Sequence, residues 1–243
     1  MLNSKFYTAF YPLRNKERIN KRSYRTINNT WDEVGGRFKE DYMLFDIDDK
    51  DVNANLFFDL KDMLGFKAHI TESEHGIHAI FKKPKEIYIG NRIHAETITG
   101  IICDYKGYGN SYERFIVDRK PLEVIEWCDE PYELPFVLFP YNLKPDLQGV
   151  KEGDGRHAIL GALNNIYARY CSDPKLILQL TNWVNDNVFK EARDKVNWSI
   201  KDVMDSIQYY NRDNLKLDDV LTKYEIDNNK LINYIVRTFK LKS

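Results

Sequence analysis

The sequence predicts an α+β fold: a mostly antiparallel sheet with flanking helices, followed by a small all-helical part. Three observations predict it. Residues 41–127 contain several short apolar runs of strand length, some of them paired across turn-like connections. Four prolines interrupt regular structure between Pro131 and Gly155. The residues after Gly155 have helical periodicity.

The predicted sheet begins with the apolar run YMLFDI at 42–47, which has the length of one buried strand. A helix is predicted at 53–66, where apolar residues form one stripe and Gly65 provides a C-terminal cap. Two hairpins complete the sheet, with strands at 67–71 and 76–82 and strands at 97–106 and 112–117. The earlier segment EVGGRFKED, at 33–41, has the glycines and charges of a loop.

The C-terminal third is predicted to be helical. Helices are expected at 156–170, 174–189 and 199–212, and most of 217–243 also has a helical pattern. Asp173-Pro174 and Ser199 have the residue types that begin helices. The predicted organisation is a first domain at 1–140, a linker at 141–154 and a helical domain at 155–243.

The overall composition limits the partners and the compartment. Lys and Arg number 36 against 37 Asp and Glu, so any nucleic acid must bind a local patch such as the basic cluster at 14–25. Cys103, Cys128 and Cys171 form no C-x-x-C pair, which argues against a zinc ribbon or a disulfide framework. No apolar run approaches the roughly 20 residues of a membrane span, and the N-terminus lacks a signal-peptide core. A soluble cytoplasmic protein without a membrane partner is expected.

Three acids stand at the ends of predicted strands. Asp46 and Asp48 share one face because side chains alternate along a strand, and Asp104 ends a second apolar strand. Carboxylate oxygens suit Mg²⁺ or Mn²⁺, and such a cation would relieve the repulsion among the acids. Taken by itself, the pair of Asp46 and Asp48 is more often part of a solvated acidic turn, and Asp104 alone is also compatible with a turn.

The turn between the strands at 67–71 and 76–82 carries groups that suit phosphate. Ser73, Gly76 and His78 offer a hydroxyl, a close-approaching backbone and an imidazole that could hold a triphosphate. The histidines His69 and His94 are expected to be satisfied core residues.

Together, the segments FDID, SEHGIH and CDYKG resemble, in order, three motifs of the archaeo-eukaryotic primase superfamily. The similarity is to the primase-polymerase branch of plasmids, phages and integrated mobile elements, and it covers Tyr42 to Phe139. Glu74 departs from the family pattern, which usually has a glycine after the serine. The opening of the helical part, GDGRH, is similar to the small C-terminal domain of such primases.

The resemblance implies an RRM-like catalytic sheet within residues 1–140 and a role for each motif residue. It implies that Asp46, Asp48 and Asp104 are catalytic and bind the metal, as two Mg²⁺ or Mn²⁺ ions. It implies that Ser73, His78 and Lys106 bind the incoming nucleotide, with Lys106 meeting phosphate.

The activity implied is that of a DNA-directed primase and polymerase, a nucleotidyltransferase that makes primers on a single-stranded DNA template from NTPs, dNTPs or both. The biological setting would be the replication of a phage, plasmid or other mobile element. No P-loop motif occurs in the sequence, so unwinding is expected from a separate replicative helicase.

Other functions fit parts of the pattern. A replication-initiation protein that binds DNA with little or no catalysis would keep this fold, although all three acids are present. A rolling-circle endonuclease places two histidines on one face of a strand, with a single residue between them, whereas two residues separate His75 from His78. A D-x-D glycosyltransferase would need a sugar-nucleotide domain of a length that nothing in this sequence suggests.

Overall fold

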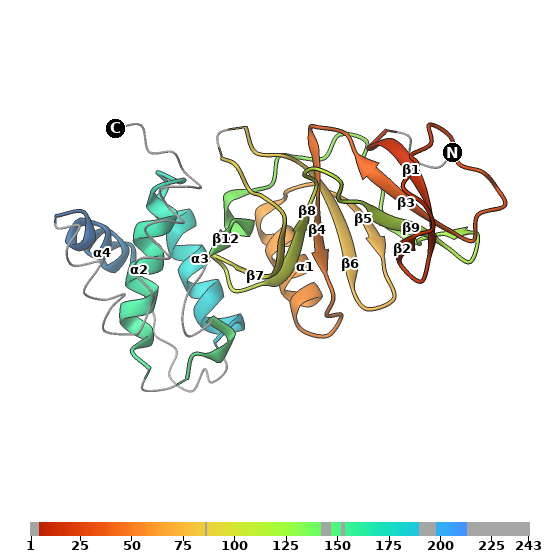
Figure 1. The fold of residues 1–243 in the computed structure, drawn as a ribbon. Helices are drawn as coiled ribbons and strands as arrows, with labels where there is room; N and C mark the ends of the chain where they lie inside the picture. The colour runs from red at the N-terminus through yellow and green to blue at the C-terminus, as the bar shows by residue number, and fades with distance from the viewer. Residues whose placement is uncertain (1–4, 86, 142–146, 152–153, 190–197, 213–243) are drawn as a thin grey trace. The chain divides into compact units, whose positions relative to one another are not determined.

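The computed structural model describes residues 5–85, 87–141, 147–151, 154–189 and 198–212. The chain divides into two compact units: unit 1 contains residues 1–95 and 102–135, and unit 2 contains residues 96–101 and 136–243. The predicted α+β class is confirmed, because the described residues form two antiparallel sheets and four α-helices (Figure 1). The division into domains at 1–140 and 155–243 with a linker between them stays a prediction.

The first sheet of unit 1 has the strand order β10-β9-β3-β1-β2. Its strands are β1 (Tyr7–Arg14), β2 (Glu17–Arg18), β3 (Glu33–Phe38), β9 (Glu113–Val117) and β10 (Lys120–Pro121). The loop predicted at 33–41 is therefore wrong for β3. The glycines there make room for aromatic rings: a Cβ at Gly35 would lie 2.7 Å from Tyr112 Cδ2, and one at Gly36 would lie 2.6 Å from Tyr7 Cδ1.

The second sheet of unit 1 has the strand order β11-β5-β6-β4-β8-β7. Its strands are β4 (Tyr42–Ile47), β5 (His69–Glu72), β6 (Ile77–Lys82), β7 (Arg92–Thr97), β8 (Ile102–Lys106) and β11 (Val124–Glu126). The central strand β4 pairs antiparallel with both β6 and β8, which explains its continuous apolar run.

One predicted hairpin is confirmed and the other is wrong. Strands β5 and β6 pair antiparallel, as the sequence predicted for 67–71 and 76–82. Strands β8 and β9 do not pair, because β8 pairs with β4 whereas β9 pairs with β3 in the other sheet. The glycines between them carry the chain across: Gly107 has a φ of 151° and approaches the backbone of Met43, where a Cβ would lie 2.8 Å from Cα.

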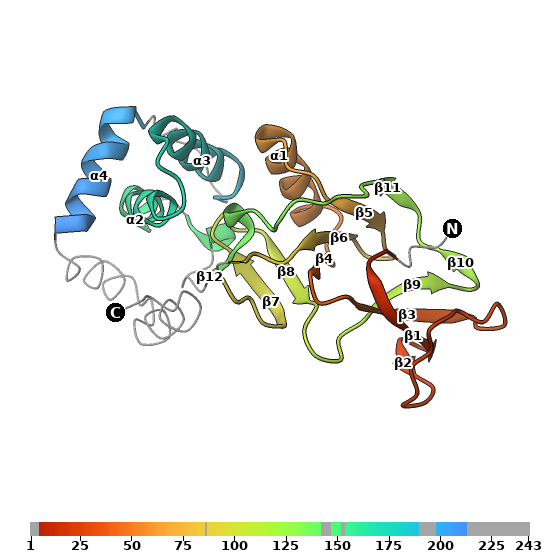
Figure 2. The same cartoon turned by 90° about the horizontal axis from the view of Figure 1, so that it is seen from above.

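Unit 1 has three layers, which Figure 2 shows from above: α1 (Asn53–Leu64), the second sheet and the first sheet. The ring of Phe57 on α1 stacks on Phe45 of β4, with centroids 5.7 Å apart. On the opposite face of β4, Leu44 belongs to a core cluster with Phe10 and Phe115 of the first sheet. Because side chains alternate along β4, Asp46 lies on the Leu44 face, between the two sheets.

Helix α1 has defined ends. Gly65 ends it with a φ of 68°, and its N–H donates to the Lys61 carbonyl over 2.7 Å, as the sequence predicted. At the start, the carboxylate of Asp49 accepts hydrogen bonds from the N–H groups of Val52 and Asn53 over 3.1 and 3.3 Å. Burial raises the pKa of Asp49, but these hydrogen bonds outweigh it and lower the pKa. Asp49 is therefore a capping residue.

Unit 2 contains the other three α-helices of the described residues (Figure 1). Its elements are β12 (Pro140–Tyr141), the short 3₁₀ helices at Phe136–Leu138 and Leu147–Gly149, α2 (Arg156–Ala168), α3 (Pro174–Asn187) and α4 (Ile200–Arg212). The N-terminal signals hold: Asp173 accepts from Lys175 N–H, and Ser199 Oγ accepts from Asp202 N–H. The helix predicted within 217–243 lies outside the described residues.

Buried hydrogen bonds join the segments of unit 2. The hydroxyl of Tyr167 on α2 donates to the Ile98 carbonyl over 3.0 Å, and Thr99 Oγ1 donates to the Val137 carbonyl over 2.9 Å.

Along the described chain, no helix has the length and apolar character that crossing a bilayer requires.

Candidate metal centre

Strand pairing brings the three predicted acids together. Asp46 on β4 stands directly opposite Asp104 on β8 in the antiparallel register. Asp48 follows β4 on the same face, and each of the three offers a carboxylate oxygen within 4.8 Å of the other two. Asp46 is buried, Asp104 is half-buried and Asp48 is exposed. The cluster is thus positioned to hold a metal ion that is reached from the Asp48 side.

The oxygens of Asp46 and Asp104 fit a hard cation. Asp46 Oδ1 is buried without a hydrogen-bond partner, although His78 Nε2 lies 3.3 Å away with poorer geometry. Asp104 Oδ1 accepts a hydrogen bond from His94 N–H over 2.7 Å, which fixes the orientation of that carboxylate. An unsatisfied buried oxygen beside two further carboxylates is a donor set that Mg²⁺ or Mn²⁺ prefers.

The two histidines that the sequence placed in the core, His69 and His94, differ in burial. His69 is buried, as predicted, and burial lowers its pKa. His94 is exposed, so the prediction is wrong for it; its φ of 51° turns its backbone N–H toward Asp104. The backbone N–H of His94 therefore contributes to the site, whereas the sequence had placed His94 in the core.

Lys106 lies among the acids. Its Nζ is 2.5 Å from Asp46 Oδ2 and 3.5 Å from Asp104 Oδ2. Burial lowers the pKa of Lys106, but the negative charge and hydrogen bond of Asp46 outweigh it and raise the pKa, so the ammonium stays charged. The Lys106 ammonium neutralises two of the carboxylates that a metal ion would bind, Asp46 and Asp104.

We expect Lys106→Met to destabilise the metal-free protein by about 1–3 kcal/mol, because it leaves the buried Asp46 carboxylate without its cation and the pair is only partly exposed. The same change should tighten Mn²⁺ binding severalfold, because no ammonium competes for the oxygens. Urea unfolding with a chelator and titration with Mn²⁺ measure the two effects. Lys50→Met, which removes an exposed ion pair with Glu72, is the matched control. Weaker Mn²⁺ binding by Lys106→Met would contradict the competition.

The turn between β5 and β6 is fixed against the end of β4. Ser73 Oγ accepts a hydrogen bond from Gly76 N–H over 3.1 Å, and Ser73 N–H donates to the Gly76 carbonyl over 3.0 Å. A Cβ at Gly76 would lie 1.6 Å from the carbonyl oxygen of Ile47, so only glycine fits. The Ser73 hydroxyl thus stabilises the turn and keeps its own proton for a further acceptor.

His78 joins the metal centre to a second buried acid. It faces Asp46 across the β4–β6 register. Its Nε2 is 3.3 Å from Asp46 Oδ1, and its Nδ1 is 2.9 Å from Glu113 Oε1. Tyr7 Oη donates a short hydrogen bond to Glu113 Oε2. Burial lowers the pKa of His78, but the hydrogen bond and charge of Glu113 and the charge of Asp46 outweigh it and raise the pKa.

The raised pKa predicts a pH dependence of stability in the metal-free protein. A histidine whose pKa is higher when folded contributes stability that is complete below its ordinary pKa of 6.5 and is lost as pH rises through the folded value. We therefore expect the difference in unfolding free energy between wild type and His78→Gln to shrink as pH rises above 6.5, through the raised folded pKa of His78. Urea titrations with a chelator measure it. A difference that grows with pH would contradict the assignment.

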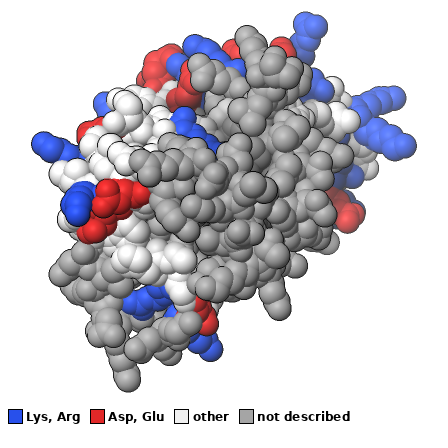
Figure 3. All heavy atoms as spheres, turned by 90° about the vertical axis from the view of Figure 1, so that its left-hand side faces the viewer, with Lys and Arg blue, Asp and Glu red and all other residues white. Residues whose placement is uncertain are grey.

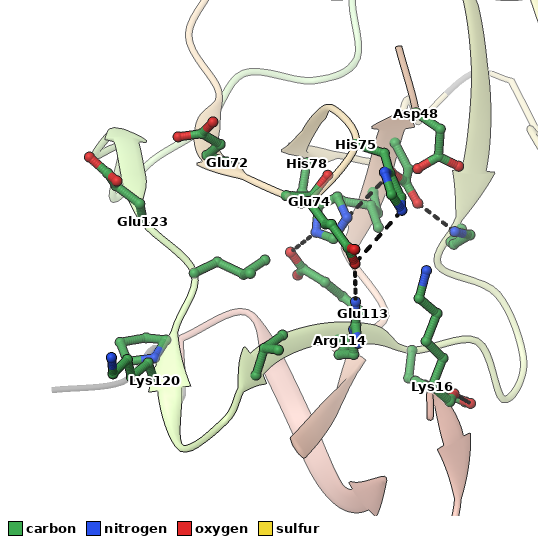
Figure 4. A pocket seen from close by; sticks show the side chains of 18 residues that line it. Lys16, Asp48, Glu72, Glu74, His75, His78, Glu113, Arg114, Lys120 and Glu123 are labelled. Atoms are coloured by element: carbon green, nitrogen blue, oxygen red, sulfur yellow. Dashed lines mark hydrogen bonds and ion pairs between the residues drawn. The ribbon is translucent and has the colours of Figure 1, made fainter. Parts of the chain in front are cut away.

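A pocket of about 690 Å³ extends from the acids between the two sheets of unit 1 (Figure 4). Figure 4 shows Asp48 at one end and Glu72, Lys120 and Glu123 at the other. The pocket contains all of the predicted site residues except Asp104: Asp46, Asp48, Ser73, His78 and Lys106. Asp104 does not line the pocket, but it belongs to the acid cluster with Asp46 and Asp48, which do.

Glu74, the departure from the family pattern, faces this pocket and pairs with a cation. Its Oε2 is 3.6 Å from Arg114 Nη2 and 3.7 Å from His75 Nε2 (Figure 4). Arg114 also lies 3.6 Å from Glu33 Oε2. The Glu74 side chain is 64% exposed, so water weakens these pairs and Glu74 can move away at low cost.

Sequence reasoning missed three residues that the first sheet contributes: Tyr7, Glu113 and Arg114. Lys16, which also lines the pocket, belongs to the basic cluster that the sequence had indicated. The one available signal was Glu113, an acid at the start of the apolar run ERFIV. Charged residues are rarely buried unless they are paired, so an acid at a strand position suggests a specific partner. Nothing local indicated that β1 and β9 would face the acids.

Comparison of the sequence with models of protein families and with curated proteins finds no match. The geometry of the site is therefore the basis for assigning a function.

Proposed function

We propose that the chain is a metal-dependent nucleotidyltransferase of the primase-polymerase type, which synthesises primers on single-stranded DNA. One observation carries the proposal: the Ser73 to His78 turn is fixed beside the cluster of Asp46, Asp48 and Asp104, at the end of a pocket of about 690 Å³. An acid cluster alone is compatible with many functions, but a carboxylate centre beside a turn with a free hydroxyl proton and an imidazole suits a metal-bound triphosphate.

The second sheet would then be the RRM-like catalytic sheet, with β4 and β8 delivering the acids. Helices α2, α3 and α4 would belong to the small helical accessory domain of such proteins. These assignments rest on the motif order and on the α+β arrangement described above.

Two Mg²⁺ or Mn²⁺ ions held by Asp46, Asp48 and Asp104 would activate the primer 3′-hydroxyl and neutralise charge on the transferred phosphoryl group. The residues of the chain supply binding and orientation. Lys106 is expected to leave the carboxylates and meet phosphate, since its ammonium and the metal would share the carboxylates of Asp46 and Asp104. The Ser73 hydroxyl and, when the ring is charged, the Nε2–H group of His78 provide further donors to the triphosphate.

The template would enter over the basic cluster at 14–25, which begins in the β1–β2 hairpin and continues beyond it. Its exposed members are Arg14, Lys16, Lys21, Arg22 and Arg25, and none of them forms an ion pair among the described residues. Lys16, at the hairpin turn, also lines the pocket, so the positive charge is continuous with the site. Uncompensated charge of this kind attracts a phosphate backbone. Figure 3 shows a different view, of the side that lies at the left of Figure 1, and on that face basic and acidic side chains of described residues lie next to one another.

A second candidate is a replication-initiation protein that binds DNA with little or no catalysis. The position of Glu74 favours it, because an acid paired with Arg114 inside the pocket would repel a triphosphate unless it moves. Such a protein would share the single-stranded DNA and the separate helicase with the first proposal. It would not need NTP or dNTP substrates, because initiation requires no nucleotide incorporation.

The deciding experiment incubates purified protein with single-stranded DNA, labelled NTPs or dNTPs and Mn²⁺. Primase activity predicts labelled products that require template and disappear with a chelator. Binding to single-stranded DNA without any labelled product would contradict the enzyme and support the initiation protein. Failure both to bind DNA and to incorporate nucleotides would contradict both.

A further inference from the structure

Glu113 is a buried acid that the acid cluster and the predicted motifs do not include. It begins β9 in the first sheet, its side chain is 1% exposed, and it points across to β6 in the second sheet. Burying a carboxylate costs several kcal/mol unless its oxygens are paired. A strand that could carry an apolar residue here carries an acid instead, so the contacts of that acid are informative.

Both Glu113 oxygens are engaged. Oε1 is 2.9 Å from His78 Nδ1, and Oε2 accepts a hydrogen bond from the Tyr7 hydroxyl. Burial and the charge of Glu113 raise the pKa of Tyr7 well above its usual range, so Tyr7 keeps its proton and remains a donor. The Tyr7 ring is itself held by stacking on Phe115, with centroids 4.8 Å apart. The position of the carboxylate is therefore fixed from the side away from His78.

The arrangement determines which ring nitrogen faces the pocket. A carboxylate only accepts hydrogen bonds, so the nitrogen beside Glu113 must carry a proton. His78 Nε2 faces Asp46, where Oδ1 lies 3.3 Å away without forming a hydrogen bond. The hydrogen bond to Glu113 over 2.9 Å therefore determines which nitrogen keeps the proton when the ring is neutral. In both its neutral and its charged form the ring keeps Nδ1–H toward Glu113, and it cannot turn over without breaking that hydrogen bond.

We propose that Glu113 is the positioning residue of His78: it fixes the ring orientation and the Nδ1 proton, so that Nε2 is presented to the substrate, and Tyr7 holds Glu113 in place. This inference rests on the proposed function, because it assigns His78 to the binding of substrate phosphate. A buried partner that orients a functional histidine in this way is typically needed at the level of 10- to 100-fold in affinity or activity.

The first test measures the proton of His78 directly and needs no activity. In wild-type protein with ¹⁵N-labelled histidine, at a pH where His78 is neutral, the proposal expects the Nδ1–H form. Glu113→Gln retains an acceptor oxygen and is expected to preserve this form, whereas Glu113→Met removes the acceptor and is expected to lose it. A wild-type ring with its proton on Nε2 would overturn the proposal.

The second test uses a double-mutant cycle on nucleotide incorporation. Glu113→Met is expected to raise the nucleotide KM by about tenfold or more, and Glu113→Gln by less than about threefold. If Glu113 acts through His78, Glu113→Met adds little once His78→Gln is present. Independent, additive losses would overturn the proposal, as would equal losses in Gln and Met variants.

Two outcomes separate this inference from the proposed function. If wild-type protein incorporates no nucleotide, the function fails, and the ¹⁵N measurement still decides whether Glu113 fixes the ring. If the enzyme is active but the cycle is additive, the positioning role alone fails. Should Glu113→Met not fold, Tyr7→Phe removes the second hydrogen bond and keeps the aromatic packing. Tyr7→Phe alone is expected to raise the nucleotide KM. Combined with His78→Gln, it is expected to have no further effect.

Discussion

Replacing Asp46 with alanine is expected to lower metal-dependent nucleotide incorporation by about 10³-fold or more, because Asp46 is the buried member of the acid cluster and both of its oxygens face the site. Asp104→Ala should have an effect of similar size, since Asp104 stands opposite Asp46 in the register. Asp48→Ala should cost less in Mn²⁺ affinity, because water can replace an exposed ligand more easily. Incorporation assays and Mn²⁺ titrations measure these losses.

The matched control for these variants is Asp51→Ala. Asp51 is an exposed acid five residues from Asp46 in the sequence, beyond the strand and outside the acid cluster. It should keep full activity and Mn²⁺ binding. Circular dichroism of each variant establishes that the fold is intact. Primer synthesis by a folded protein without Asp46, Asp48 and Asp104 would exclude the proposed chemistry.

Gly76→Ala is expected to destabilise the protein by about 3 kcal/mol or more, at the upper end of overpacking effects. The added Cβ would meet the Ile47 carbonyl oxygen at 1.6 Å and its carbon at 2.7 Å, and backbone atoms in a paired strand cannot rotate away. Relief requires the turn to move off β4, which separates His78 from Asp46. Incorporation should therefore fall together with stability, as urea unfolding and kinetic assays of the same preparation would show.

Gly90→Ala provides the comparison for this prediction. A Cβ at Gly90 would lie 3.4 Å from Tyr88 Cε1, an ordinary contact with the ring of a side chain that is 63% exposed. Its effect should stay within about 1 kcal/mol. If the two alanine variants proved equally stable, the close approach of the turn to β4 would not be a feature of the folded protein.

The position of Lys106 changes how the site is understood. The resemblance implied a phosphate contact, whereas the structure places the ammonium on Asp46 and Asp104. The two are compatible if Lys106 moves when a metal takes its place. A cation supplied by the chain keeps three neighbouring acids compatible with folding before any metal binds.

Local features of the fold followed from local sequence patterns. The apolar run of β4, the stripe and Gly65 cap of α1, and the Asp173 start of α3 each depend on residues within a few positions of one another. Helical and strand periodicities are properties of a short segment, so they can be recognised without knowing what the segment packs against. Asp46 and Asp48 were found in the same way, by alternation along a single strand.

Features that join distant segments did not follow from local patterns. Strands β8 and β9 are separated by a glycine-rich turn, which predicts a hairpin, yet they belong to different sheets. The glycines of β3 appeared loop-like because the rings of Tyr7 and Tyr112 that fill the space beside them come from elsewhere in the chain. Propensity describes one segment, whereas packing depends on its neighbours.

Local sequence patterns were sufficient to predict the α+β class, the three helices between Arg156 and Arg212, and the two antiparallel strands on either side of the Ser73 to His78 turn. That Lys106 neutralises the acids and that Glu113 and Tyr7 hold His78 became visible in the folded protein. The physical reason is that charge and hydrogen-bond partners are chosen by distance in space. Glu113 lies 35 positions from His78 and Tyr7 lies 106 positions from Glu113, and the packing of one sheet on the other brings them into contact.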